Sequence, residues 1–334
     1  MESFVCIFAQ TLAPKFLGGI ADYLINSLIG KMGSFVQLFF ILSGFSMCCG
    51  YYEKIKNNQI SLYKFYSRRY VKILPFFTLL VLMDLAVSMV FDGGIGTSNI
   101  YEAFADLTLL FGFLPASDIT VIGVGWTLGV IFGFYILFPF FVYLLWNKKR
   151  AWLSLVITTA LNYVCTVYFT VDGEAVECNV LRYLCYFIAG GIIYLYRDEI
   201  SGLIKNGLLG ILITLLGFAL VFMVENPVSG LVGPLIGTLK RMLGYTFMVA
   251  GALCAETKLW SNPVSKFISG VSLEIYLAHM MVFRVIEKLG MTTIAGGSVV
   301  SYVIACIGTI GGALIFAIVY QYAEGIIKKK VVKA

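Results

Sequence analysis

The sequence predicts an all-α integral membrane protein with about ten transmembrane helices and both termini on the cytoplasmic side. Three observations predict this fold class. Apolar residues gather in continuous runs of about twenty, the length that crosses the hydrocarbon core as a helix. Only 13% of the residues are charged, about half the share of a soluble domain. Basic and acidic loops alternate between the runs, as the positive-inside rule requires.

Eleven apolar runs are candidates for membrane-crossing helices. They lie at 3–20, 34–52, 73–91, 105–117, 126–146, 152–170, 181–196, 207–224, 236–256, 268–286 and 298–323. The run at 105–117 is too short to span and contains Asp106 and Pro115, so we expect it to be interfacial or re-entrant. The other ten are expected to span as helices, because lipid leaves backbone polar groups no partner outside the segment.

The charged loops predict the orientation of these spans. Basic residues gather at 53–72, 148–150, 197–205, 258–266 and 328–333. Loops between these segments are acidic, at 92–118 and 172–177. Only the pair Lys240 and Arg241 breaks the alternation. Because the basic residues lie in short loops and not in one stripe, the net charge of +6 does not indicate nucleic-acid binding.

The chain is expected to form a single transmembrane domain over residues 1–334, since it shows no internal repeat and no linker. Its eight cysteines lie mostly inside apolar runs and match no zinc or redox spacing, so no metal site is predicted. The N-terminus shows no basic n-region and no small-residue cleavage site, so the first run is expected to act as its own insertion signal.

The densest polar feature is the pair Arg68 and Arg69 with Lys72, at the cytoplasmic mouth of the third run. Guanidinium groups bind phosphate through two parallel hydrogen bonds, so adjacent arginines could clamp a phosphate group. The alternative is that these residues anchor the topology and touch lipid headgroups.

Four further polar or amphipathic residues lie in or beside the runs. Trp126 opens one run, where a tryptophan usually belongs to the aromatic belt. His279, the only histidine, and Asp84 lie within runs, where an ionisable residue marks either function or a hydrogen bond to a neighbouring helix. Arg182 begins another run and could face a cavity or the membrane interface.

Five elements, taken in chain order, resemble the acyltransferase 3 family of membrane acyltransferases. They are the Ser-Gly-Phe ending of 33–45, the basic element 65–75, Trp126-Thr127-Leu128 with 134–139, Arg182 with Phe187 and Gly190, and the segment 272–279. The resemblance covers nearly the whole chain.

The resemblance implies a membrane O-acyltransferase that moves an acyl group, often acetyl, from acyl-CoA to a hydroxyl of a cell-envelope glycan. It implies that Arg68, Arg69 and Lys72 bind the acyl-CoA donor, and it makes His279, Trp126 and Arg182 catalytic candidates without a metal. Expected partners are membrane lipid and an envelope glycan or lipid-linked sugar, without nucleic acid, and a homo-oligomer stays open. The expected location is the cell membrane, crossed many times.

Two positions depart from the family pattern. The histidine expected near the end of the first run falls on Ala13, or alternatively on Gln10, and the glutamate expected after Trp-Thr-Leu falls on Ile131. Acyl transfer to a hydroxyl needs a base, so His279 or a carboxylate such as Asp84 would have to replace them. Two alternatives stay open: an impaired relative that binds a glycan or a partner protein, and a polysaccharide exporter or flippase.

Overall fold

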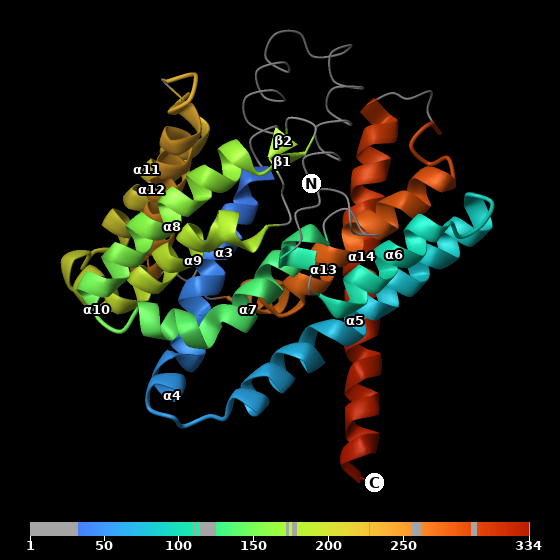
Figure 1. Cartoon of the computed structure of the whole chain (residues 1–334). Coiled ribbons are helices and arrows are strands. Elements are labelled where there is room, and N and C mark those ends of the chain that lie inside the picture. Colours follow the sequence, from blue (N-terminus) through green and yellow to red (C-terminus); the bar gives the residue numbers. More distant parts are fainter. Residues whose placement is uncertain are drawn as a thin grey trace.

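The computed structural model describes residues 33–333, with gaps at 110, 114–124, 172–173, 176–178, 227, 256–261 and 295–298. Within these residues the chain is built almost entirely from helices (Figure 1). Its β-structure there is one antiparallel pair of two-residue strands, β1 (Thr170–Val171) and β2 (Glu174–Ala175). The first expected span, 3–20, and the departure at Ala13 lie outside the described residues.

The described residues form the following helices, in chain order: α3 (Phe35–Met47), the π-helix η3 (Cys48–Tyr52), α4 (Glu53–Lys56), α5 (Leu62–Phe91), α6 (Thr97–Thr108), the 3-10 helix η4 (Phe111–Phe113), α7 (Trp126–Leu144), α8 (Lys148–Tyr168), α9 (Val180–Leu195), α10 (Arg197–Leu203), α11 (Gly207–Phe222), α12 (Gly233–Cys254), α13 (Pro263–Lys288) and α14 (Val299–Lys333).

The described residues contain six helical segments that are long and apolar enough to cross a membrane. They are Phe35–Lys56, Leu62–Phe91, Trp126–Leu144, Lys148–Tyr168, Pro263–Lys288 and Val303–Ile326. A seventh results if α10 and α11, which are bent by 112° at a short break, count as one span. The helical membrane class is therefore confirmed, whereas ten spans and cytoplasmic termini stay predictions.

The helix boundaries differ from the apolar runs at several places. The basic segment 53–72, expected as a loop, is helical in α4 and again from Leu62, so the Arg68 element belongs to the long helix α5. That helix continues through Pro75, which lacks one backbone donor but leaves the helix intact. The described part of the run at 105–117 contains the end of α6 and the short helix η4, and both elements are too short to span.

Polar side chains define where several helices begin. The Ser61 hydroxyl accepts a hydrogen bond from the backbone N–H of Lys64 at 3.2 Å, and the Asn262 side chain accepts one from Ser265 at 2.8 Å. Asn147 caps α8 in the same way. Each cap satisfies an N–H that has no partner within its own helix, which fixes the start of α5, α8 and α13.

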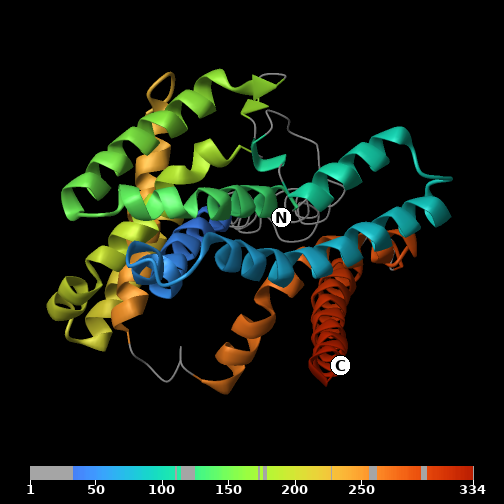
Figure 2. The same cartoon turned by 60° about the horizontal axis from the view of Figure 1, so that its bottom comes forward.

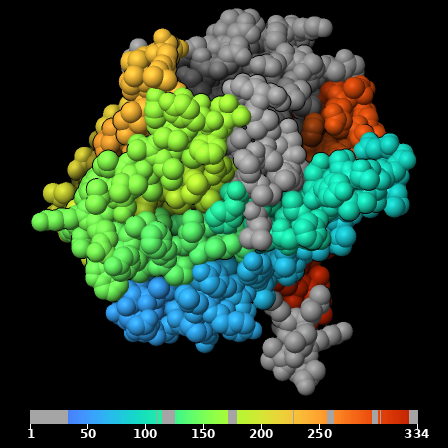
Figure 3. Space-filling view, viewed as in Figure 1, coloured from blue at the N-terminus to red at the C-terminus, as the bar shows by residue number. Residues whose placement is uncertain are grey.

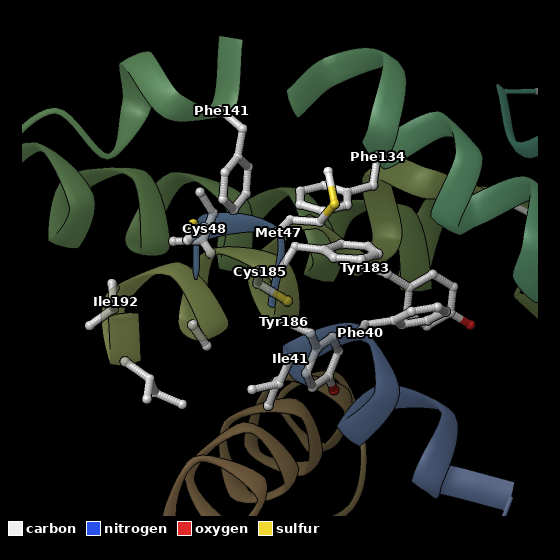
Figure 4. Packing of buried hydrophobic residues seen from close by; sticks show 14 of the residues in the cluster. Phe40, Ile41, Met47, Cys48, Phe134, Phe141, Tyr183, Cys185, Tyr186 and Ile192 are labelled. Atoms are coloured by element: carbon white, nitrogen blue, oxygen red, sulfur yellow. The ribbon is translucent and has the colours of Figure 1, made fainter. Parts of the chain in front are cut away.

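The helices pack in two groups that lie side by side in Figure 1 and Figure 2. One group contains α3, α8, α9, α11 and α12, and the other contains α5, α6, α13 and α14. Helix α7 joins them, because its Phe134 belongs to the first core and its Phe132 to the second. Figure 4 shows part of the first core, to which Phe134 of α7, Phe40 of α3 and Tyr183 of α9 contribute; the rings of Phe40 and Tyr183 lie 4.9 Å apart between centres.

Helices α3 and α9 cross with their backbones in close approach. A Cβ added to Gly44 would clash with the carbonyl group of Phe187, and one added to Gly190 would clash with the carbonyl oxygen of Ile41. Small residues allow such contacts between membrane helices. The crossing explains why glycine stands at both positions and fixes the helix that carries Phe40 against the rest of the first group.

Candidate functional site

A cavity of about 360 Å³ lies where the two helix groups meet. It is lined by residues from α3, α5, α7 and α13. The lining residues are Val36, Phe39, Phe40, Leu42, Ser43, Ser46, Met47, Arg69, Lys72, Ile73, Thr127, Leu128, Ile131, Tyr135, Ser269, Ser272, Leu273 and Tyr276. Four of the five elements singled out in the sequence therefore contribute to one site, which we call the central cavity.

The lining positions follow helical spacing on each element. On α5 they are Arg69, Lys72 and Ile73, and on α13 they are four residues from Ser269 to Tyr276. Residues three and four apart lie on the same face of a helix. Each of the four helices thus presents one continuous face to the central cavity.

Arg69 is the best-fixed cation of this cavity. Its guanidinium carbon lies 4.5 Å from the ring centre of Tyr51 on η3 and 5.3 Å from that of Tyr135 on α7. Such cation–π contacts orient a guanidinium, and the side chains of Tyr51 and Tyr135 also hydrogen-bond Arg69. Its Nε atom is buried and makes no hydrogen bond to the described residues. The two rings therefore hold a positive charge in place at the cavity wall.

Arg68 faces a different space. With Ser67, Val71 and Lys72 it lines a groove of about 510 Å³ whose other walls are α13 and α14. Neighbouring residues leave a helix about 100° apart, which lets the two long side chains line different spaces. The two arginines line different spaces but both hydrogen-bond the side chain of Tyr51, and only Lys72 lines both the central cavity and this lateral groove.

His279 lies one turn beyond Tyr276 on α13 and is half-buried. Its Nδ1 lies 2.5 Å from the carbonyl oxygen of Tyr276. A carbonyl oxygen only accepts, so Nδ1 carries the proton and Nε2 of the neutral ring is the basic nitrogen. Nε2 is buried and has no hydrogen-bond partner in the described part of the chain. His279 itself is outside the cavity lining, next to Tyr276.

Trp126 and Arg182 lie behind the wall of the central cavity. The Trp126 ring packs against Phe40 at 6.4 Å and Tyr183 at 5.7 Å between ring centres. The Arg182 guanidinium lies 5.5 Å from the ring centre of Tyr183. Neither side chain lines the cavity, whereas Thr127, next to Trp126, does. The two predicted residues therefore meet through Tyr183 and support the α3 wall.

Asp84 belongs to an ion cluster between α5 and α13. Arg284 donates to its carboxylate and to the hydroxyl of Ser88, the latter at 2.9 Å. Asp92, just past the end of α5, lies 2.5 Å from Arg284 and 2.5 Å from Lys288. The Lys288 ammonium, and after it the Arg284 guanidinium, holds the pKa of the Asp92 carboxyl below its usual range. Asp84 is thus neutralised by a partner and does not line the central cavity.

Tyr51 and Arg284 were not singled out from the sequence, whereas Tyr135 and Tyr276 lie inside the elements 134–139 and 272–279 without having been named as site residues. Tyr51, Tyr135 and Tyr276 carry rings that hold Arg69 or line the cavity, and Arg284 is the partner of Asp84. Helical spacing from Ile131 would have marked Tyr135, four positions later, as the member of 134–139 that faces the same side. A charge inside an apolar run, the signal used for His279, also applies to Arg284.

No group of three or more metal-ligating side chains occurs among the residues that the structure describes. The cavity chemistry there rests instead on cations, hydroxyl groups and aromatic rings. Such a set suits an organic ligand that carries phosphate or hydroxyl groups.

Comparisons with known proteins identify the family of the chain. A protein of Haemophilus influenzae, described as an uncharacterized protein, is 25% identical over 224 residues, which cover 59% of this chain and 91% of the relative. No solved structure matches the chain. A family model described as an acyltransferase domain matches residues 19–318, and the chain therefore belongs to the acyltransferase 3 family of membrane proteins.

Proposed function

We propose that the protein is a multi-pass O-acyltransferase of the cell membrane that moves an acyl group, in the first instance acetyl, from acyl-CoA to a hydroxyl of a cell-envelope glycan. The observation that carries the proposal is the central cavity, which collects one face from each of four family elements and has the cations Arg69 and Lys72 in its lining.

The donor end of the proposal rests on charge. Acyl-CoA carries phosphate groups at one end and a thioester at the other. Arg69 offers a planar fork of donors that its two ring contacts have already oriented, and Lys72 adds a second cation on the same helix face. We therefore assign the donor phosphates to Arg69 and Lys72, with Arg68 in a lesser role because it faces the lateral groove.

The proposed reaction is a direct transfer. The acceptor hydroxyl oxygen forms a bond to the thioester carbonyl carbon, and the carbon–sulfur bond breaks. A base takes the hydroxyl proton, and the proton passes to the departing thiolate to give free CoA. We assign this base to His279, whose Nε2 is the basic nitrogen and which lies one turn beyond Tyr276 of the cavity lining; its ring has to turn toward the cavity when the acceptor binds, because Nε2 is buried outside the lining.

The acceptor end of the proposal rests on hydroxyl groups and rings. Hydroxyl-bearing residues in the cavity lining are Ser43, Ser46, Thr127, Ser269, Ser272, Tyr135 and Tyr276. Such groups both donate and accept hydrogen bonds, as a sugar hydroxyl does. They support an envelope glycan or lipid-linked sugar as the acceptor, which would enter from the outer side or from within the bilayer.

One observation favours a second candidate, a relative with impaired catalysis that binds a glycan or partner protein. Ile131 lines the central cavity at the position where the family pattern expects a glutamate. An apolar side chain there removes a proton acceptor from the site. Turnover of acetyl-CoA by the wild-type protein would eliminate this candidate.

The deciding experiment is calorimetric titration of acetyl-CoA into the detergent-solubilised full chain, followed by an assay of CoA thiol release with a glycan acceptor. We expect Arg69→Gln to bind acetyl-CoA about tenfold more weakly, because one charge-assisted contact is lost. Arg68→Gln is the matched control on the same helix and should bind nearly as the wild type. No binding to a folded wild-type protein would contradict the proposal.

A further inference from the structure

We propose that the lateral groove between α5, α13 and α14 binds the headgroup of a zwitterionic phospholipid of the phosphoethanolamine type. The groove has a volume of about 510 Å³ and is separate from the central cavity, which it meets at Lys72. Figure 3 shows the start of α5 (blue) and a part of α14 (red) together on the lower surface of the molecule.

The groove carries both signs of charge on opposite walls. Arg68 and Lys72 lie on α5, whereas Glu274 of α13 and Glu324 of α14 lie across from them. Neither Arg68 nor Lys72 forms an ion pair with a carboxylate of the described chain. A headgroup with one phosphate and one ammonium matches this division, with its phosphate on α5 and its ammonium on α13 and α14.

The carboxylate wall is held in place. The Gln321 amide donates to Glu274 Oε1 at 3.2 Å and to the carbonyl oxygen of Gly270 at 2.9 Å. A Cβ added to Gly270 would meet no atom within 4 Å, so this wall faces open space. A fixed carboxylate beside an open groove favours a cationic group of a ligand.

The same carboxylates argue against the nucleotide end of acyl-CoA in this groove. That end carries several negative charges, which Glu274 and Glu324 would repel. The central cavity, in contrast, has cations and no carboxylate in its described lining. The polyanionic donor therefore binds in the central cavity, and the zwitterion binds in the groove.

The surroundings of the groove suit a lipid. The rings of Phe76 on α5 and Tyr320 on α14 lie 4.7 Å apart between centres, so α5 and α14 are in contact beside the groove. Val71 of the groove lining and Val319 of α14 are 57% and 59% exposed, so apolar surface flanks the opening. Acyl chains can lie along this surface while the headgroup stays in the groove.

Native mass spectrometry of the full chain in detergent tests the proposal. The probes are phosphatidylethanolamine and phosphatidylglycerol with identical acyl chains, added in equal amounts. We expect preferential retention of phosphatidylethanolamine. Arg68→Gln and Glu274→Gln should each weaken that retention about tenfold, because each removes one charge-assisted contact. Lys64→Gln, an exposed cation one turn before Arg68 and outside the groove, is the matched control and should retain the lipid as the wild type does.

Three results would overturn the proposal. The first is equal retention of both lipids, or a preference for phosphatidylglycerol, by the wild-type protein. The second is retention of phosphatidylethanolamine that neither Arg68→Gln nor Glu274→Gln reduces in variants that remain folded by circular dichroism. The third is displacement of the lipid by acetyl-CoA, which would show that the groove binds the acyl-CoA donor. Loss of acetyl-CoA binding in Arg69→Gln is measured separately, so failure of one proposal does not decide the other.

Discussion

The guanidinium of Arg284 on α13 donates a hydrogen bond to the carboxylate of Asp84 on α5, 200 positions away in the chain. The Asp84 side chain is 4% exposed and that of Arg284 is 28% exposed, so the pair is largely removed from solvent. It fastens α5 to α13, the two helices that also bring Arg69 and Tyr276 to the central cavity.

Breaking this pair should destabilise the protein strongly. We expect Arg284→Met to lower the free energy of unfolding by about 3 kcal/mol, because the substitution leaves the buried carboxylate of Asp84 without its charged partner. The double variant Asp84→Leu/Arg284→Met should recover much of this loss, since two apolar side chains need no partner. Equilibrium unfolding in detergent micelles measures both variants.

The control is the exposed ion pair between Lys148 and Glu199, whose side chains are 46% and 50% exposed. Surface pairs contribute little because solvent screens them, so Lys148→Gln should leave the unfolding midpoint nearly unchanged. Similar losses of stability in Lys148→Gln and Arg284→Met would show that the buried pair of Asp84 and Arg284 contributes no more than an exposed pair does.

The ion pairs of Asp92 with Lys288 and Arg284 predict that the stability of the protein depends on pH. Lys288 and then Arg284 lower the pKa of Asp92 in the folded protein, so Asp92 favours folding at every pH above its unfolded pKa. That contribution is lost as the pH falls from the unfolded value of about 3.9 through the lower folded value. Melting curves of wild type and Asp92→Asn between neutral pH and pH about 3 should therefore converge below pH about 4. A constant difference across that range would contradict the assignment.

The crossing of α3 and α9 predicts a steric effect of one methyl group. In Gly44→Ala or Gly190→Ala the new Cβ would clash with backbone atoms of the partner helix, which cannot rotate away. We expect each variant to lose about 2 kcal/mol of stability, the usual cost of forced overpacking. Gly50→Ala is the control, because a Cβ there meets no atom within 4 Å. Unfolding curves in detergent compare the three variants, and an equal effect of Gly50→Ala would refute the close crossing.

The membrane class was predictable because apolar runs of about twenty residues have few other uses. The helix ends were not. Hydropathy marks the hydrocarbon core, whereas a helix continues past it when long cationic side chains reach the interface, as α5 does from Leu62 through Arg68. The pairing of Asp84 with Arg284 depends on which helices are neighbours, and apolar periodicity alone does not contain that information.

The candidate site was predictable in part for a related reason. The motifs named Arg69, Lys72 and the Trp126 element, and the structure brings the first two to one cavity with Thr127 and Leu128 of the third. Adjacency in sequence did not reveal that Arg69 lines the central cavity and Arg68 the lateral groove while both hydrogen-bond Tyr51. Trp126 and Arg182 stay catalytic candidates by resemblance, and their positions behind the cavity wall give them a supporting contact through Tyr183.

The proposed base predicts a separation of binding from chemistry. In His279→Gln we expect kcat for acyl transfer to fall by about 10²-fold or more, because no basic nitrogen remains to take the acceptor proton. Acetyl-CoA binding should stay unchanged, since His279 is outside the lining that holds Arg69. Thiol release and calorimetry on the same preparation measure the two effects. Unchanged kcat would remove His279 from the mechanism and leave the base unassigned.

The Tyr51 ring predicts an effect on the affinity for acetyl-CoA through the orientation of the Arg69 guanidinium. Tyr51 does not line the central cavity, yet its ring centre lies 4.5 Å from the Arg69 guanidinium. Tyr51→Leu keeps the charge of Arg69 but frees the side chain to rotate, so we expect acetyl-CoA to bind about three- to tenfold more weakly. The matched control is Tyr143→Leu, which removes a ring 4.6 Å from the exposed guanidinium of Arg150. If Tyr51→Leu binds acetyl-CoA as tightly as the wild type does, Arg69 needs no fixed orientation. If Tyr143→Leu loses affinity as well, the effect is a general one of removing such rings.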